Sequence, residues 1–188
     1  MMKSVNLPGM RRTIVASAVM LAGTFGFIVS ASAGEQPAGE LLNKNGMHIL
    51  GVFLQPVVME PAMPGQEADK TDIHLEADIA ALPTNANGFY EDAWIPYLDV
   101  DYQLERTGSD WHQAGKLMAM VASDGPHYGA NVKLDGPGEY HVTFHINPPE
   151  GGHFMHHVDK ETGVAPWWQP FDYDGTFIFA GAGKKGGY

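Results

Sequence analysis

The amino-acid sequence predicts an all-β protein, an immunoglobulin-like antiparallel β-sandwich. Short runs in which apolar and polar residues alternate are separated by clusters of Gly, Pro, Asn and Asp, which is the pattern of strands joined by turns. No long run keeps the period of an α-helix. About seven such strands in one domain of this length are typical of an immunoglobulin-like sandwich.

The run with the strictest alternation is "TDIHLEADIA", residues 71–80. Its apolar positions are Ile73, Leu75, Ala77 and Ile79. Its polar positions are Asp72, His74, Glu76 and Asp78. Because neighbouring side chains of a strand point to opposite faces, this run predicts a strand with one face in the core. The other face then carries a row of three carboxylates and one imidazole.

The same pattern recurs along the rest of the chain. The other predicted strands lie in residues 47–57, 96–106, 113–122, 128–134, 138–147 and 170–181. The sequence "DGPGE" at residues 135–139 predicts the turn between two of these strands. We expect residues 34–46 to form a flexible lead-in, within a single domain of residues 34–188.

The first 33 residues have the pattern of a cleaved secretory signal peptide. Residues 1–12 carry basic side chains and no acid, residues 14–29 are mostly apolar, and small residues follow up to Ala33. A membrane anchor is the alternative, but the apolar run is shorter than a usual membrane span and two glycines interrupt it. We therefore expect an exported protein that has no direct membrane insertion after cleavage.

Charge and composition restrict the partners. The formal net charge is −11, and removal of the three basic residues of the signal lowers it to −14. This acidity excludes nucleic acid and anionic lipid surfaces as partners, and it is compatible with cations as ligands. The chain has no Cys, which excludes disulfides and thiolate metal centres. Its nine His and ten Met, with Asp and Glu, are therefore the available metal ligands.

Two segments carry candidate metal ligands on strands. His74 and Glu76 lie two residues apart on one strand face, so both can reach one cation; a solvated polar face is the alternative. In "KLMAMVASDGPHYGAN", Met120 shares a strand face with Met118, and a Gly-Pro pair holds the position of His127. Packing in the core is the alternative for the two Met side chains.

A third segment, "GGHFMHHVDKETG", combines a Gly-rich loop with several metal-binding side chains. These side chains are His153, Met155, His156 and His157. Such a composition is common at metal sites, and a surface loop is the alternative. Imidazole and thioether donors suit copper, whereas a carboxylate suits harder ions such as iron, so the combined set predicts a site for copper that also accepts iron.

Several motifs resemble those of the periplasmic high-affinity iron transport proteins. The motifs are "QPVVMEP", "DIHLEADI", "LMAMVASDGPHYGAN" and "HHVDKETGVAPWWQPF", which lie in order over about residues 46–180. That family accompanies Ftr-type inner-membrane iron permeases and includes a related treponemal lipoprotein antigen. The resemblance implies a periplasmic homodimer with an immunoglobulin-like fold, a copper site near the dimer interface and an iron position beside it.

The resemblance also assigns the ligands residue by residue. It implies metal ligation by His74, Glu76, Met120, His127 and His157. It adds Met59, which would approach from the partner subunit. Asp124 and His156 are further candidate ligands from this sequence itself. Two features depart from the family pattern: Ser123 stands where a close pattern has an acid, and the loop around His156 carries more donors than usual.

The function expected from these observations is non-catalytic metal binding for high-affinity iron uptake. The protein would bind copper and iron ions and pass iron to the permease. The alternatives are periplasmic copper handling and copper-dependent iron oxidation or reduction. The sequence contains no nucleophile triad and no nucleotide-binding loop, so hydrolase and kinase functions have no basis.

Overall fold

The computed structural model describes residues 34–149 and 154–182, and the predicted signal peptide, residues 1–33, lies outside them. Within these ranges every regular element is a β-strand and none is a helix, which confirms the all-β prediction. The strands are β1 (Gln36–Pro37), β2 (Leu42–Lys44), β3 (Met47–Leu54), β4 (Ile73–Ala81), β5 (Asp99–Arg106), β6 (His112–Ala122), β7 (Gly125–Val132), β8 (Gly138–Asn147) and β9 (Phe171–Phe179).

Each of the seven predicted runs overlaps one of the strands β3 to β9. Strands β4 and β6 each extend one residue beyond their predicted runs, and β7 begins at Gly125, three residues before its run. The expectation of a flexible lead-in at residues 34–46 is wrong, because this segment forms β1 and β2, which both pair with β3. Ala38 is fully buried, and Leu42 packs against the core opposite Ile49. The segment is therefore held by burial as well as by backbone hydrogen bonds.

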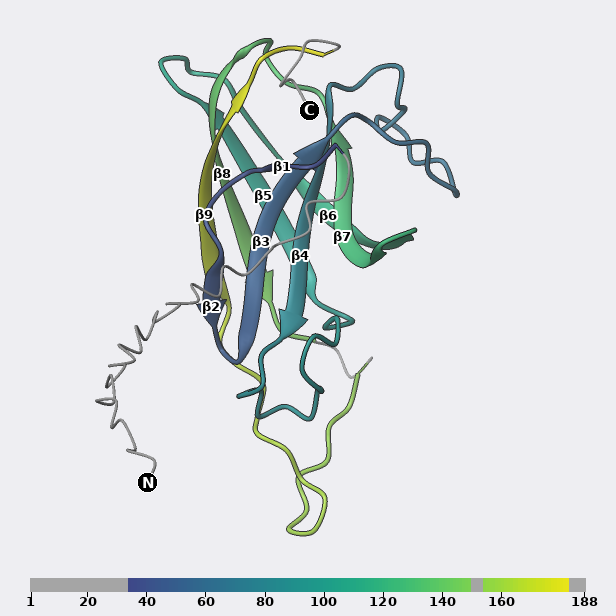
Figure 1. Cartoon of the computed structure of the whole chain (residues 1–188), viewed down its shortest axis with the longest axis vertical. Helices are drawn as coiled ribbons and strands as arrows, with labels where there is room; N and C mark the ends of the chain where they lie inside the picture. Colours follow the sequence, from purple (N-terminus) through teal and green to yellow (C-terminus); the bar gives the residue numbers. More distant parts are fainter. Residues whose placement is uncertain (1–33, 150–153, 183–188) are drawn as a thin grey trace, which may run out of the picture. The chain divides into compact units, whose positions relative to one another are not determined.

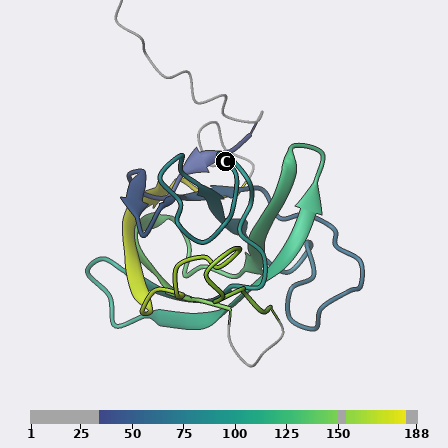
Figure 2. The same ribbon diagram turned by 90° about the horizontal axis from the view of Figure 1, so that it is seen from below.

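The strands form an antiparallel sandwich whose two sheets share one strand (Figure 1). The hydrogen-bonded order is β1-β3-β4-β7-β6-β5-β8-β9, and β2 pairs with β3 at the side. The first half of β6 pairs with β5, up to Leu117 opposite Val100, and its second half pairs with β7, from Met118 opposite Gly129. Figure 2 shows the strands surrounding the core when seen along them.

The core lies between the two sheets and collects the inward positions of the alternating runs. Leu75 and Ile79 of β4 are buried there, as the alternation predicts. Aromatic rings fill the opposite side, where Phe144 and Tyr173 stack with centroids 5.4 Å apart. The outward row of β4 is also inaccessible to water near its start: His74 is 1% exposed and Glu76 is 6% exposed. This buried polar row positions the site described next.

Candidate metal centre

The candidate site lies on the outward face of the sheet formed by β4, β7 and the end of β6. His74 and Glu76 come from β4, and His127 comes from β7. Strand alternation places each of these side chains on the face opposite the core. The antiparallel register then sets Glu76 opposite Gly129 and His127 opposite Met120. Two neighbouring strands thus bring their polar side chains to one place, and Met120 of β6 lies beside them.

Gly129 makes room for this convergence. A Cβ atom at this position would lie 2.7 Å from Nε2 of His74 and 3.3 Å from Cδ2 of His127. Both distances are shorter than an ordinary van der Waals contact, and the first cannot occur without movement of the ring. The absence of a side chain at Gly129 therefore lets the two imidazoles approach each other above the sheet.

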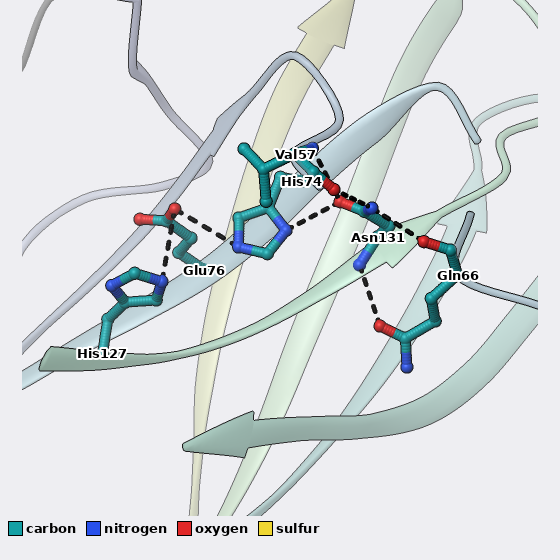
Figure 3. Close-up of polar contacts among 6 residues, drawn as sticks. All are labelled: Val57, Gln66, His74, Glu76, His127 and Asn131. Atoms are coloured by element: carbon teal, nitrogen blue, oxygen red, sulfur yellow. Dashed lines mark hydrogen bonds and ion pairs between the residues drawn. The ribbon is translucent and has the colours of Figure 1, made fainter. Parts of the chain in front are cut away.

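We call His74, Glu76 and His127 the metal cradle. Oε1 of Glu76 lies 3.5 Å from Nε2 of His74 and 3.6 Å from Nε2 of His127 (Figure 3). One potential ligand atom from each residue lies within 4.8 Å of the others. Both Nε2 atoms are buried and form no hydrogen bond with the described residues. Buried polar atoms are normally paired, so two unpaired nitrogens facing a carboxylate fit a bound cation.

Burial also sets the charge state of the cradle. It raises the pKa of Glu76 to about 8, with further contributions from the charges of Asp78, Glu35 and Asp124. Burial lowers the pKa of His74 to about 4, and it lowers the pKa of His127 as well. At neutral pH and without a metal, both imidazoles are therefore neutral and keep a free lone pair, and the carboxyl group is protonated.

The donor set agrees with the chemistry expected from the sequence. Two imidazole nitrogens and one carboxylate oxygen suit copper and iron, and a thioether would add a preference for Cu(I). Met120 shares the outward face with His127, directly opposite it in the register, and is partly buried. Met118 lies two residues earlier on that face and is 42% exposed. The alternative that both Met side chains pack in the core is therefore wrong.

Other candidate ligands lie outside the cradle. Asp124 is in the turn between β6 and β7, where its charge contributes to the raised pKa of Glu76. His157 lies in the loop after β8; its Nδ1 contacts Oγ1 of Thr162 at 2.7 Å, and its side chain is exposed. His156 packs edge-on against Trp167 in the same loop. His153 lies outside the described residues.

Met59 lies in the segment between β3 and β4, residues 55–72, which we call the β3–β4 loop. There it lines an apolar groove of about 380 Å³ together with Met63 and Val58. Within the described part of the chain, the cradle is the only cluster of three His or acidic side chains close enough to share an ion. The structure thus brings three of the predicted ligands together, sets Met120 beside them, and leaves His156 and His157 outside this cluster.

The sequence analysis missed two residues of the site, Gly129 and Asn131. Oδ1 of Asn131 lies 2.8 Å from Nδ1 of His74, within hydrogen-bond distance (Figure 3). Both residues follow His127 at intervals of two on β7, so they share its outward face. The alternation along this strand predicts that both residues lie on the same face as His127, but it does not predict what they do there.

Among the residues that the structure describes, no helix is long and apolar enough to cross a membrane.

Comparison with known proteins identifies relatives over nearly the whole chain. Residues 32–181 match the family described as Fe2+ transport protein. A UPF0423 protein of Brucella abortus is 46% identical over 182 residues, which are 95% of this chain and 100% of the relative. The 34 kDa membrane antigen of Treponema pallidum is 40% identical over 147 residues, 75% of this chain and 72% of the antigen.

Solved structures show the same similarity. FetP of uropathogenic Escherichia coli strain F11, expressed in the periplasm of E. coli, is 49% identical with a TM-score of 0.76, covering 80% of this chain and 99% of FetP. Copper-reconstituted P19 of Campylobacter jejuni is 47% identical with a TM-score of 0.77, covering 80% of this chain and 99% of P19. Because the family match extends over most of the sequence, the chain belongs to the Fe2+ transport protein family.

Proposed function

We propose that this chain is a periplasmic metal-binding protein of high-affinity iron uptake, which binds copper and iron ions at the metal cradle. The observation that carries the proposal is the pair of buried, unpaired Nε2 atoms of His74 and His127 on either side of Glu76. Burying such atoms without a partner costs free energy, and one bound cation would give a partner to both nitrogens at once.

The two metals would use the donors differently. Copper takes imidazole nitrogen readily and, as Cu(I), thioether sulfur, so His74, His127 and Met120 would dominate its binding. Iron takes the hard oxygen of Glu76, and the nearby charges of Asp78 and Asp124 favour any cation. Copper-bound forms of both FetP and P19 support the copper part of this proposal.

Binding and transfer, rather than catalysis, is the proposed activity, with an Ftr-type permease as the recipient of iron. The predicted secretory signal and the periplasmic expression of the similar protein FetP support a periplasmic location. We also propose a homodimer, because the exposed His157 lies outside the cluster of cradle residues on its own chain and would reach a cradle from a second copy. Sedimentation of metal-free and copper-loaded protein measures the oligomeric state, and a monomer in both forms would remove this proposal.

Calorimetric titration with copper, and with Mn(II) as a redox-stable substitute for iron, tests the site. His127→Ala should lower the copper affinity by more than roughly 100-fold, since even residues behind the ligands contribute 10- to 100-fold. His145→Ala is the matched control: this exposed histidine of β8 pairs with Asp172 and lies outside the cradle. Equal copper affinity of wild type and His127→Ala would contradict the proposed site.

Growth separates the proposed pathway from periplasmic copper handling. Loss of the gene should impair growth when iron is limiting if the protein serves iron uptake. It should raise copper sensitivity if the protein handles copper. The copper alternative has one observation in its favour, which is the soft thioether of Met120 opposite His127.

A further inference from the structure

Asn131 of β7 makes an unusually complete set of polar contacts behind the metal cradle. Its Nδ2 donates to the backbone carbonyl of Val57 at 2.7 Å and to that of Gln66 at 2.8 Å. Its Oδ1 accepts from the backbone N–H of Val57 at 3.2 Å and lies 2.8 Å from Nδ1 of His74. Its backbone N–H donates to Oε1 of Gln66 at 3.2 Å. Asn131 is only 3% exposed, so water does not compete for these contacts.

The contacts with the β3–β4 loop determine the orientation of the side-chain amide. Two carbonyl oxygens, of Val57 and Gln66, lie within hydrogen-bond distance of Nδ2. Exchanging the amide oxygen and nitrogen of Asn131 would place an acceptor against these two acceptors and a donor against the N–H of Val57. The orientation is thus fixed by backbone groups alone, without any assumption about the histidine.

This orientation in turn determines which nitrogen of His74 carries the ring proton. The atom next to Nδ1 is an amide oxygen, which accepts hydrogen bonds and cannot donate one. Nδ1 must therefore carry hydrogen to form the contact of 2.8 Å. A neutral imidazole has one ring proton, so Nε2 keeps its lone pair, and that lone pair points toward Glu76 (Figure 3). Nε2 also borders the space above Gly129, where a Cβ atom would lie 2.7 Å from it.

We propose that Asn131 is a positioning residue, which selects the metal-binding tautomer of His74 and links the β3–β4 loop to the metal cradle. It does not contact the metal itself. Its action on metal binding rests on the function proposed above, whereas its action on the tautomer does not. A hydrogen bond behind a ligating histidine typically fixes the ring and raises metal affinity 10- to 100-fold.

Nuclear magnetic resonance of the metal-free full-length exported protein tests the tautomer directly. Correlation of ring protons with ring nitrogens distinguishes protonated from unprotonated nitrogen, and the His74→Gln variant assigns the signals of His74. The expected result is a protonated Nδ1 and an unprotonated Nε2. A proton on Nε2, or an equal mixture of the two tautomers, would overturn the proposal.

Variants of Asn131 separate positioning from a purely structural role. Asn131→Ala should disturb the tautomer and lower copper affinity about 10- to 100-fold. Asn131→Asp keeps an oxygen beside Nδ1 of His74 but cannot donate to the two carbonyls. It should keep the Nδ1–H tautomer while hydrogen exchange at the amide of Val57 becomes faster. If Asn131 serves only to fasten the loop, Asn131→Ala will change the loop and leave both tautomer and copper affinity as in the wild type.

Asn87 offers a matched control. Its Nδ2 also donates to two backbone carbonyls, of Ala165 at 3.0 Å and Pro166 at 3.1 Å, and it follows the other end of β4. Asn87→Ala should loosen its own loop without effect on the His74 tautomer or on copper affinity. If wild-type protein binds no copper, the proposed function fails, but the tautomer measurement still decides the role of Asn131.

Discussion

Replacement of Gly129 by Ala is the smallest change that should damage the metal cradle. Gly129 has a backbone conformation that other residues can adopt, so the effect comes from the added methyl group alone. That methyl would lie 2.7 Å from Nε2 of His74, 3.1 Å from its Cε1 and 3.3 Å from Cδ2 of His127. The nearest of these atoms is a proposed metal ligand.

The required movement can be worked out from the structure. Ordinary contact begins at 3.4 Å, so the ring of His74 must withdraw by about 0.7 Å. It is not free to do so, because Asn131 holds Nδ1 at 2.8 Å and the side chain is 1% exposed. The ring must tilt away from Glu76 or the strands must separate. We expect copper affinity to fall about 10- to 100-fold, which corresponds to about 1.4–2.7 kcal/mol.

Overpacking also destabilises a fold, so the loss of affinity needs a control for stability. Gly51 of β3 faces the core, where an added Cβ would lie 3.0 Å from Tyr173 and 3.1 Å from Phe144. Gly51→Ala should therefore cost stability, on the order of 1–3 kcal/mol, without loss of copper affinity. Competition against a chelator measures the affinity, and thermal unfolding of the metal-free proteins measures the stability. Wild-type copper affinity in a folded Gly129→Ala protein would refute the steric argument.

Three further predictions concern the donors. Glu76→Gln removes a hard anionic ligand at constant size, so calorimetry should show a larger loss for Mn(II) than for copper; equal losses would refute the division between hard and soft donors. Met120→Ala should weaken Cu(I) most, as measured by competition with a Cu(I) chelator. Copper affinity should rise about tenfold per pH unit from pH 5 to 8 and then level off, because a metal must displace the proton of Glu76, whose pKa is about 8. A flat pH profile in that range would show that the carboxyl group does not ligate.

Local alternation was enough to predict most of the strands and two of the three residues of the metal cradle. Strand side chains repeat with a period of two, so the sequence alone places His74 and Glu76 on one face of β4. The prediction for residues 34–46 failed because β1 and β2 are very short and gain their order from pairing with β3. Contacts between distant segments, rather than their own sequence pattern, stabilise them.

The remainder of the site depends on register between strands, which local patterns do not contain. Only the pairing of Glu76 with Gly129 and of Met120 with His127 shows that these residues meet. Local sequence patterns also do not predict that the polar row of β4 is buried, because an outward row with three carboxylates is normally solvated. The β3–β4 loop is held beside the start of this row by hydrogen bonds with Asn131, and a loop of that kind has no periodic pattern in the sequence.

The metal cradle lies on the outer face of a sheet that already has its own apolar core. This position affects how the protein would bind and release a metal ion. Small metal-binding domains often fold only when the ion is bound, because the ion replaces a missing core. Here an apolar core between the two sheets supports the fold, and the cradle lies on the other face of β4. Without metal, burial favours neutral His74 and protonated Glu76, so no buried charge is left unpaired. The fold can therefore hold the ligands in place before an ion arrives and after it leaves, which suits a protein that takes up and releases its cargo.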